Sequence, residues 1–106
     1  MKTYKIIVSQ EARESLKAIT DYIRRKESDT RAQYVRKELL KAVDRLESLP
    51  NSHPIIYVSE QKKTYRYLLK WQYKIIFTVQ DTKNRVIVVR LFHDKQDPKL
   101  LKDLLE

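Results

Sequence analysis

Apolar residues recur through the first half of the chain at the spacing of amphipathic helices. Between residues 10 and 26 they step by four, three and four positions, at Ala12, Leu16, Ile19 and Ile23. This spacing stacks them in one stripe along a helix. A second stripe alternates steps of three and four from Ala32 to Leu49. Because the polar residues 27–30 separate the two stripes, the pattern predicts two helices that pack as an antiparallel hairpin.

The residues at the ends of these stripes fit helix termini. Ser9 precedes Gln10 and Glu11, which offers an N-cap side chain followed by an acid in the first turn. The polar residues 27–30 supply caps for the second helix, and Pro50 ends its pattern. We therefore expect helices over about 10–26 and from about 31 to Leu49.

The second half of the chain changes to the pattern of extended strands. Residues 64–69, 73–79 and 86–92 are rich in β-branched and aromatic residues, as is the short segment 4–8 before the first helix. These segments predict an N-terminal strand and an antiparallel three-strand meander. The segment 86–92 is apolar almost throughout, which predicts a central strand buried on both faces. Residues 55–58 fit either a short strand or an extended loop.

Turn and helix signals complete the pattern. The chain has no glycine, so Asn84 is expected to take the left-handed conformation in the turn of residues 81–84. Asp97-Pro98 fits a helix start, and a short helix follows with an apolar side of Leu100, Leu101 and Leu104. These leucines either close the core or remain available to a partner. The predicted fold is α+β, a single domain over residues 1–106 with the helical hairpin as one layer and the sheet as the other.

Composition excludes several classes of function. Without cysteine there is neither a disulfide nor a thiolate metal site, and two separated histidines argue against a zinc cluster. Without glycine there is no Walker loop and no dinucleotide-binding turn. We therefore expect no cofactor. The chain shows no signal peptide and no apolar run of the roughly 20 residues that a membrane span needs, so we expect a cytoplasmic protein without a membrane partner.

The charge of the chain points to a macromolecular partner. The net charge is +9, and the larger part of the excess lies in residues 61–102. Such a field favours a polyanion through counterion release, or an acidic protein through electrostatic steering. The charge alone does not distinguish the two.

The candidate functional residues lie in this basic half. They are Arg66, Lys70, Lys74, Arg90, His93 and Lys95, with Tyr65, Tyr67 and Tyr73 between them. We expect Arg66 and Lys74 to share one face of the sheet, where cations bind phosphate and tyrosines stack on unpaired bases. The alternative is that these charges only keep the sheet soluble.

Two further side chains have alternative roles. His93 titrates near neutrality and is a candidate general acid or base, although a histidine beside Asp94 also fits a structural hydrogen bond. Trp71 either anchors a turn between strands or contributes to a partner surface.

The order and spacing of several short motifs resemble the RelE/ParE superfamily of toxins from bacterial type II toxin-antitoxin systems. The resemblance spans nearly the whole chain. It rests on Val8-Ser9 with the first helical stripe and Tyr22-Ile23, on the end of the second helix at 46–50, and on the segments 65–68, 73–77 and 88–93. It implies a plasmid-stabilising growth inhibitor that a cognate antitoxin neutralises.

The two branches of this superfamily imply different mechanisms. RelE-like members cleave messenger RNA on the ribosome, and ParE-like members poison DNA gyrase. In a nuclease, Arg66, Lys74 and Lys95 would supply cations and His93 a proton-transfer group. The aromatic acid/base expected near the C-terminus of nuclease members is missing, because no tyrosine follows Phe92.

The long helical hairpin resembles the ParE branch, which implies a gyrase-directed toxin that is not itself an enzyme. The resemblance then implies a contact surface that includes Arg66, Tyr73, Lys74, Arg90, His93 and Lys95. A ribosome-dependent nuclease, an inactive relative that only binds its antitoxin, and a plain nucleic-acid-binding module are the alternatives.

Overall fold

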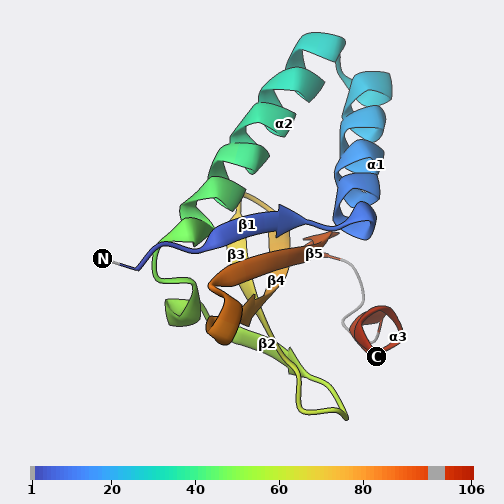
Figure 1. Cartoon of the computed structure of the whole chain (residues 1–106). Coiled ribbons are helices and arrows are strands. Elements are labelled where there is room, and N and C mark those ends of the chain that lie inside the picture. Colours follow the sequence, from blue (N-terminus) through green and yellow to red (C-terminus); the bar gives the residue numbers. More distant parts are fainter. Residues whose placement is uncertain (1, 96–99) are drawn as a thin grey trace.

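The helices and strands follow one another in the predicted order (Figure 1). The computed structural model describes residues 2–95 and 100–106. Its helices are α1 (Gln10–Lys26), α2 (Asp29–Asp44) and α3 (Leu100–Leu105), and its strands are β1 (Lys5–Val8), β2 (Ile55–Val58), β3 (Thr64–Lys70), β4 (Tyr73–Gln80) and β5 (Arg85–His93). The α+β fold is therefore confirmed. The Asp97-Pro98 pair expected to open the last helix lies outside the described residues.

Serine side chains cap both long helices, as the sequence predicts. The Oγ of Ser9 accepts a hydrogen bond from the backbone N–H of Ala12 at 3.1 Å, and the Oγ of Ser28 accepts one from Arg31 at 3.0 Å. Each bond satisfies a donor that the first turn of a helix leaves without a partner inside the helix. The two starts of the hairpin are thus fixed by local chemistry.

The end of the second helix differs from the prediction. The α-helix ends at Asp44, and a 3₁₀ turn over Arg45–Glu47 keeps Leu46 buried. Leu49 lies outside the apolar stripe, with a φ of 51° and 69% of its surface exposed. The prediction that Leu49 belongs to the stripe is wrong, because Pro50 disfavours a right-handed helical conformation in the residue before it.

Among the described residues, four that are not glycine have positive φ angles: Leu49, Lys62, Trp71 and Asn84. Asn84, at 51°, confirms the prediction for the turn that follows the 3₁₀ residues Asp81–Lys83. The left-handed conformation costs an L-residue about 1–2 kcal/mol, less for asparagine. Because the chain has no glycine, the left-handed positions other than Asn84 are occupied by residues with bulkier side chains.

The sheet has five strands in the order β1-β5-β4-β3-β2. The meander of β3, β4 and β5 is antiparallel, as predicted, and β2 adds an antiparallel edge strand, which decides between the two interpretations of residues 55–58. β1 pairs with β5 in parallel, from Lys5 opposite Arg85 to Val8 opposite Val88. β5 is therefore an interior strand with two neighbours, although β4 occupies the middle of the sheet.

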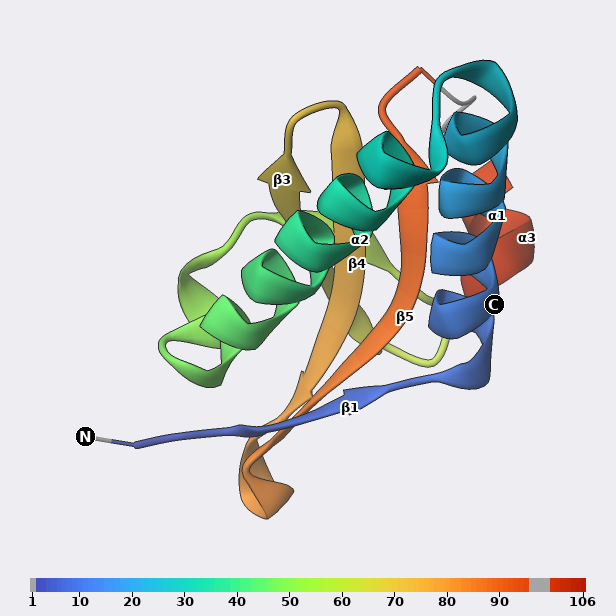
Figure 2. The same ribbon diagram turned by 90° about the horizontal axis from the view of Figure 1, so that it is seen from above.

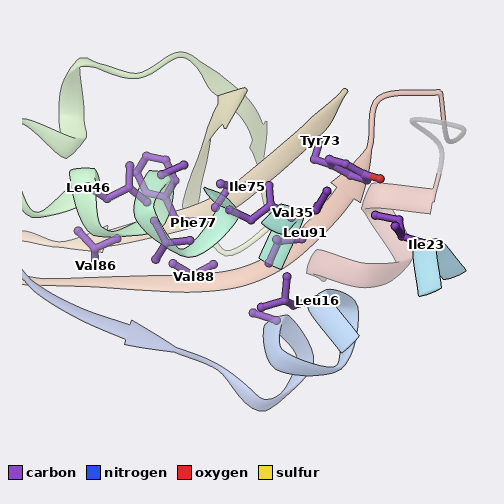
Figure 3. Packing of buried hydrophobic residues seen from close by; sticks show 14 of the residues in the cluster. Leu16, Ile23, Val35, Leu46, Tyr73, Ile75, Phe77, Val86, Val88 and Leu91 are labelled. Atoms are coloured by element: carbon purple, nitrogen blue, oxygen red, sulfur yellow. The ribbon is translucent and has the colours of Figure 1, made fainter. Parts of the chain in front are cut away.

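The larger core lies between the sheet and the two long helices. Figure 2 shows α1 and α2 crossing the same face of the sheet, and Figure 3 shows their apolar side chains meeting those of β4 and β5. Among the buried members are Leu16, Ile23, Val35, Leu46, Ile75, Phe77, Val86, Val88 and Leu91. The predicted burial of the helical stripes against the sheet is confirmed for these residues.

A second core on the opposite face adds a third layer. Leu101 and Leu105 of α3 pack against Tyr65, Ile76 and Phe92 and are 6% and 7% exposed. The expectation of two layers is therefore incomplete. The C-terminal helix closes a core of its own, with Leu104 half-buried beside it.

A bulge explains how β5 contributes to both cores. Ile76 pairs with Arg90 and Phe77 with Val88, so Val89 is the extra residue on β5. The bulge changes the alternation along the strand. Val88 and Leu91, three residues apart, consequently face the helices, while Phe92 faces α3. The prediction of a strand buried on both faces is confirmed.

Candidate partner-binding surfaces

The predicted cations do not share one face of the sheet. Arg66 on β3 lies opposite Phe77, which belongs to the core under the helices. Lys74 lies opposite Leu69 and two residues before Ile76 on the same strand, so it points to the α3 face with Ile76. The expectation that Arg66 and Lys74 share a face is therefore wrong. Side chains alternate along a strand, and the register of this pair sets even positions of β3 beside odd positions of β4.

Arg66 is held in a structural contact at the helix face. Its Nη1 donates a hydrogen bond to the carbonyl oxygen of His53 at 2.7 Å. The His53 ring meets Phe77 edge to face, with ring centroids 5.7 Å apart. Burial, and then the charge of Arg66, lower the pKa of His53 below its ordinary value. Arg66 thus helps to fix the loop before β2.

Lys74 lies on the α3 face, where one acid and one ring contact it. Its Nζ is 3.1 Å from the Oδ1 of Asp94 and 5.4 Å from the centroid of the Tyr67 ring. Arg90 points to the same face, because it pairs with Ile76. The half-exposed ion pair makes Lys74 a weaker free cation than its sequence position suggests.

Tyr73 and His93 pair across β4 and β5 at the helix face. Their rings meet edge to face, with centroids 5.5 Å apart and an interplanar angle of 88°. The Nδ1 of His93 accepts a hydrogen bond from the backbone N–H of Lys95 at 3.0 Å. Since Nδ1 is an acceptor, a neutral imidazole carries its hydrogen on Nε2. Burial is the main cause that raises the pKa of Tyr73 above its ordinary value.

The six predicted site residues therefore do not form one cluster. Tyr73, His93 and Lys95 lie together where β4 begins and β5 ends. Lys74 lies at the same end of the sheet but on the α3 face, as does Arg90 three residues before His93. Arg66 lies at the other end of β3, beside His53.

An open hollow lies beside this corner. Its volume is about 1150 Å³, and its walls come from α1, α2, the β3–β4 turn, the end of β5 and α3. Apolar residues of α1 line it together with carboxylates from three elements, Glu14, Glu27 and Asp103. Such a mixed surface suits a polypeptide better than a small ligand.

Sequence reasoning missed an aromatic pair next to the hollow. The rings of Tyr34 on α2 and Trp71 in the β3–β4 turn lie 6.1 Å apart at 31°. The guanidinium of Arg31 lies 5.4 Å from the Tyr34 centroid, and the Nζ of Lys70 lies 4.6 Å from that of Trp71. We call these four residues the aromatic corner. The sequence indicates this surface in one way only: the aromatic residue Tyr34 lies outside the apolar stripe of its helix.

The described part of the chain offers no evident metal site or membrane span. Among residues 2–95 and 100–106 no group of three histidine or acidic side chains is placed to hold a metal ion. Within the same residues no helix is long and apolar enough to cross a bilayer.

Comparison with known families identifies the lineage of this fold. The family described as the ParE toxin of the type II toxin-antitoxin system parDE matches residues 6–98. The chain belongs to the ParE toxin family. The match runs from β1 through the end of β5, so it covers the hairpin, the meander and the candidate surfaces of the toxin.

Solved structures share the fold of this toxin at low sequence identity. The chromosomal ParDE system of P. aeruginosa matches at 16% identity with a TM-score of 0.72, covering 88% of this chain and 98% of that one. The RelBE2 complex of Mycobacterium tuberculosis matches at 16% with a TM-score of 0.62 over 88% and 93%. The archaeal RelE-RelB complex of Pyrococcus horikoshii matches at 13% with a TM-score of 0.57 over 90% and 99%. No curated protein matches in sequence.

Proposed function

We propose that this ParE-family toxin arrests growth in the cytoplasm by binding DNA gyrase and trapping the enzyme on cleaved DNA. In this mechanism the toxin performs no chemistry of its own. A cognate antitoxin binds the toxin and neutralises it, as the type II system of the family implies.

The observation that supports binding over RNA cleavage is the separation of the candidate catalytic groups. Cleavage through a 2′-hydroxyl needs a base, an acid and cations that converge within hydrogen-bond reach of one phosphate. Arg66 is at the helix face and donates to the carbonyl oxygen of His53, whereas Lys74 is at the α3 face and pairs with Asp94. A general acid or base can tolerate loose geometry before substrate binds, but residues on opposite faces of a sheet cannot act on one phosphate.

The charge of the toxin also supports a target that contains DNA. Its net charge is +9, and the proposed target is gyrase in complex with DNA, a polyanion. Positive charge increases the rate of association with such a complex and makes it sensitive to salt. The charge contributes to attraction, and specific contacts must provide the selectivity.

Pulse-labelling of DNA and protein synthesis within minutes of induction tests the proposal. Early arrest of DNA synthesis with broken chromosomal DNA is expected. In vitro, the purified toxin should convert supercoiled plasmid to cleaved DNA only when gyrase and ATP are present. Early arrest of protein synthesis with intact DNA would contradict the proposal.

A ribosome-dependent nuclease is the second candidate. It is favoured by the closeness of Tyr73, His93 and Lys95 where β4 begins and β5 ends. Primer extension on messenger RNA from induced cells distinguishes it, because a nuclease leaves new 5′ ends within translated regions. A chain that arrests neither DNA nor protein synthesis but still binds the antitoxin would be an inactive relative.

The antitoxin can be tested directly. Co-expression of a small open reading frame next to the toxin gene should restore growth and give a complex that co-purifies. A toxin that stays active in the presence of every neighbouring gene product would contradict this part of the proposal.

A further inference from the structure

The aromatic rings of the corner are largely exposed to solvent and are not part of the core. Tyr34 is 48% exposed and Trp71 is 41% exposed, and Tyr22, at 55%, lines the adjoining hollow together with Trp71. Neither Tyr34 nor Trp71 belongs to the two buried clusters. Clustered exposed aromatic side chains are typical of interaction sites in soluble proteins.

The backbone holds Trp71 in this position despite an unfavourable conformation. Trp71 is the first residue of the two-residue turn between β3 and β4, and its φ is 53°. Glycine, asparagine or aspartate would occupy this position with less strain. The turn instead places the only tryptophan of the chain against Tyr34 of α2. Strain of this kind is often found at functional sites.

Cations lie on the exposed rings. Arg31, with 51% of its side chain exposed, lies over Tyr34, and Lys70 lies over Trp71. Tryptophan, tyrosine and arginine are the residues most enriched among binding hot spots at protein interfaces. The Nε of Arg31 also lies 4.0 Å from Glu27, so the charge of the corner is partly balanced, and the rings offer an apolar contact at the centre.

The neighbouring acids favour a protein over a nucleic acid as the occupant. Glu14, Glu27 and Asp103 line the hollow that adjoins the corner. These carboxylates repel a phosphate backbone that follows the hollow, whereas a polypeptide can donate backbone N–H groups to them.

We propose that the aromatic corner of Arg31, Tyr34, Lys70 and Trp71 is the surface by which the toxin binds the protein part of its target, around an apolar anchor of that partner. This inference rests on the proposed gyrase function and names a contact surface for it. The surface lies outside the basic set of Arg66, Lys74, Arg90, His93 and Lys95, so it makes a separate experimental claim.

A gyrase cleavage assay with matched variants tests the inference. The measured quantity is the concentration of toxin that gives half-maximal plasmid cleavage by gyrase. Trp71→Ala and Tyr34→Ala should each raise it by about 30-fold, the loss typical of a hot spot. Leu49→Ala, at a more exposed apolar residue near the other end of α2, should change it by less than about threefold.

A charge reversal separates a specific contact from general attraction. Arg31→Glu should raise the half-maximal concentration by tenfold or more, whereas Lys41→Glu on the same helix should have a much smaller effect although it changes net charge equally. Circular dichroism of each variant checks that it is folded. If Trp71→Ala does not fold, Tyr34→Ala and Arg31→Glu decide, because both side chains are about half exposed.

The outcomes distinguish the inference from the function on which it rests. An active wild-type toxin with equally active Trp71→Ala, Tyr34→Ala and Arg31→Glu variants overturns the inference alone. A wild-type toxin that gives no cleavage with gyrase overturns the gyrase function and this inference with it. Quenching of Trp71 fluorescence by single-stranded oligothymidylate, with a steep loss of affinity in salt, would assign the corner to nucleic acid and also overturn the inference.

Discussion

Lys70 and Tyr73 face each other across the two-residue turn that joins β3 to β4. This pairing sets the register of the whole strand pair. It sends Arg66 to the face under the helices and Lys74 to the face under α3. The turn that places Trp71 at the surface is therefore also the element that separates the basic residues.

Substitution of His93 tests whether the toxin uses proton transfer. His93→Phe keeps a ring against Tyr73 but cannot carry a proton. Under the gyrase mechanism its toxicity should stay within about threefold of wild type, whereas loss of a general acid or base lowers the rate about 100-fold or more. Growth arrest over a range of induction levels measures the difference. A loss of the larger size, in a variant that still folds, would favour the nuclease.

Two leucines of one sequence pattern should differ in their contribution to stability. Leu46 is fully buried, so Leu46→Ala should lower the free energy of unfolding by about 2–5 kcal/mol. Leu49 is 69% exposed, and Leu49→Ala should change it by no more than about 0.5 kcal/mol. Urea denaturation of both variants provides the comparison. Equal losses would mean that Leu49 packs in the helical stripe after all.

The contact between Arg66 and His53 should appear in a titration. We expect the pKa of His53, followed by NMR, to lie below its ordinary value because of burial and the charge of Arg66. Arg66→Gln should raise this pKa only part of the way, since burial remains. An unchanged His53 pKa in this variant would exclude a contribution from the Arg66 charge.

The same group gives a pH dependence of stability with a definite sign. With the folded pKa of His53 below its unfolded value of about 6.5, the unfolded chain binds more protons between the two values. The contribution of His53 to stability is therefore complete above the unfolded pKa and falls as the pH drops through that window. His53→Asn should reduce the slope of stability against pH in this range.

The caps of the hairpin can be tested with two serines of the same helix. Ser9→Ala removes the N-cap bond to Ala12 and should cost about 1 kcal/mol. Ser15→Ala removes only a bond from an exposed hydroxyl to the carbonyl oxygen of Glu11 and should be neutral or slightly stabilising. Thermal denaturation of the two variants gives the comparison.

Local signals in the sequence predict where helices and strands lie, but they do not predict which face of the sheet a strand residue points to. The stripes of the two helices as far as Leu46, the Ser9 cap and the left-handed Asn84 each depend on a few neighbouring residues, and these are confirmed. The face of a strand residue depends instead on register, and a shift of one residue reverses it. No local signal in the sequence indicates whether the β3–β4 turn contains two residues or three. Because the length of this turn sets the register, the faces of Arg66 and Lys74 cannot be predicted from the sequence.

Contacts between segments that are distant in the sequence could not be predicted from local signals either. The docking of α3 on Tyr65 and Phe92 depends on which face the helical hairpin leaves open. The aromatic corner joins α2 to a turn some 40 residues later in the sequence. Tyr34 gave a partial signal by its position outside the helical stripe, but its partner Trp71 could be recognised only in three dimensions.

The parallel pairing of β1 with β5 has a consequence for how the toxin is made. β1 is synthesised before the other strands, yet among the described strands it pairs with β5 alone, from Lys5 opposite Arg85 onward. Closure of such a long loop is slow, and the sheet cannot be completed until residue 85 and those after it have been synthesised. The last of the five strands to be synthesised is thus the one that holds the first strand in the sheet.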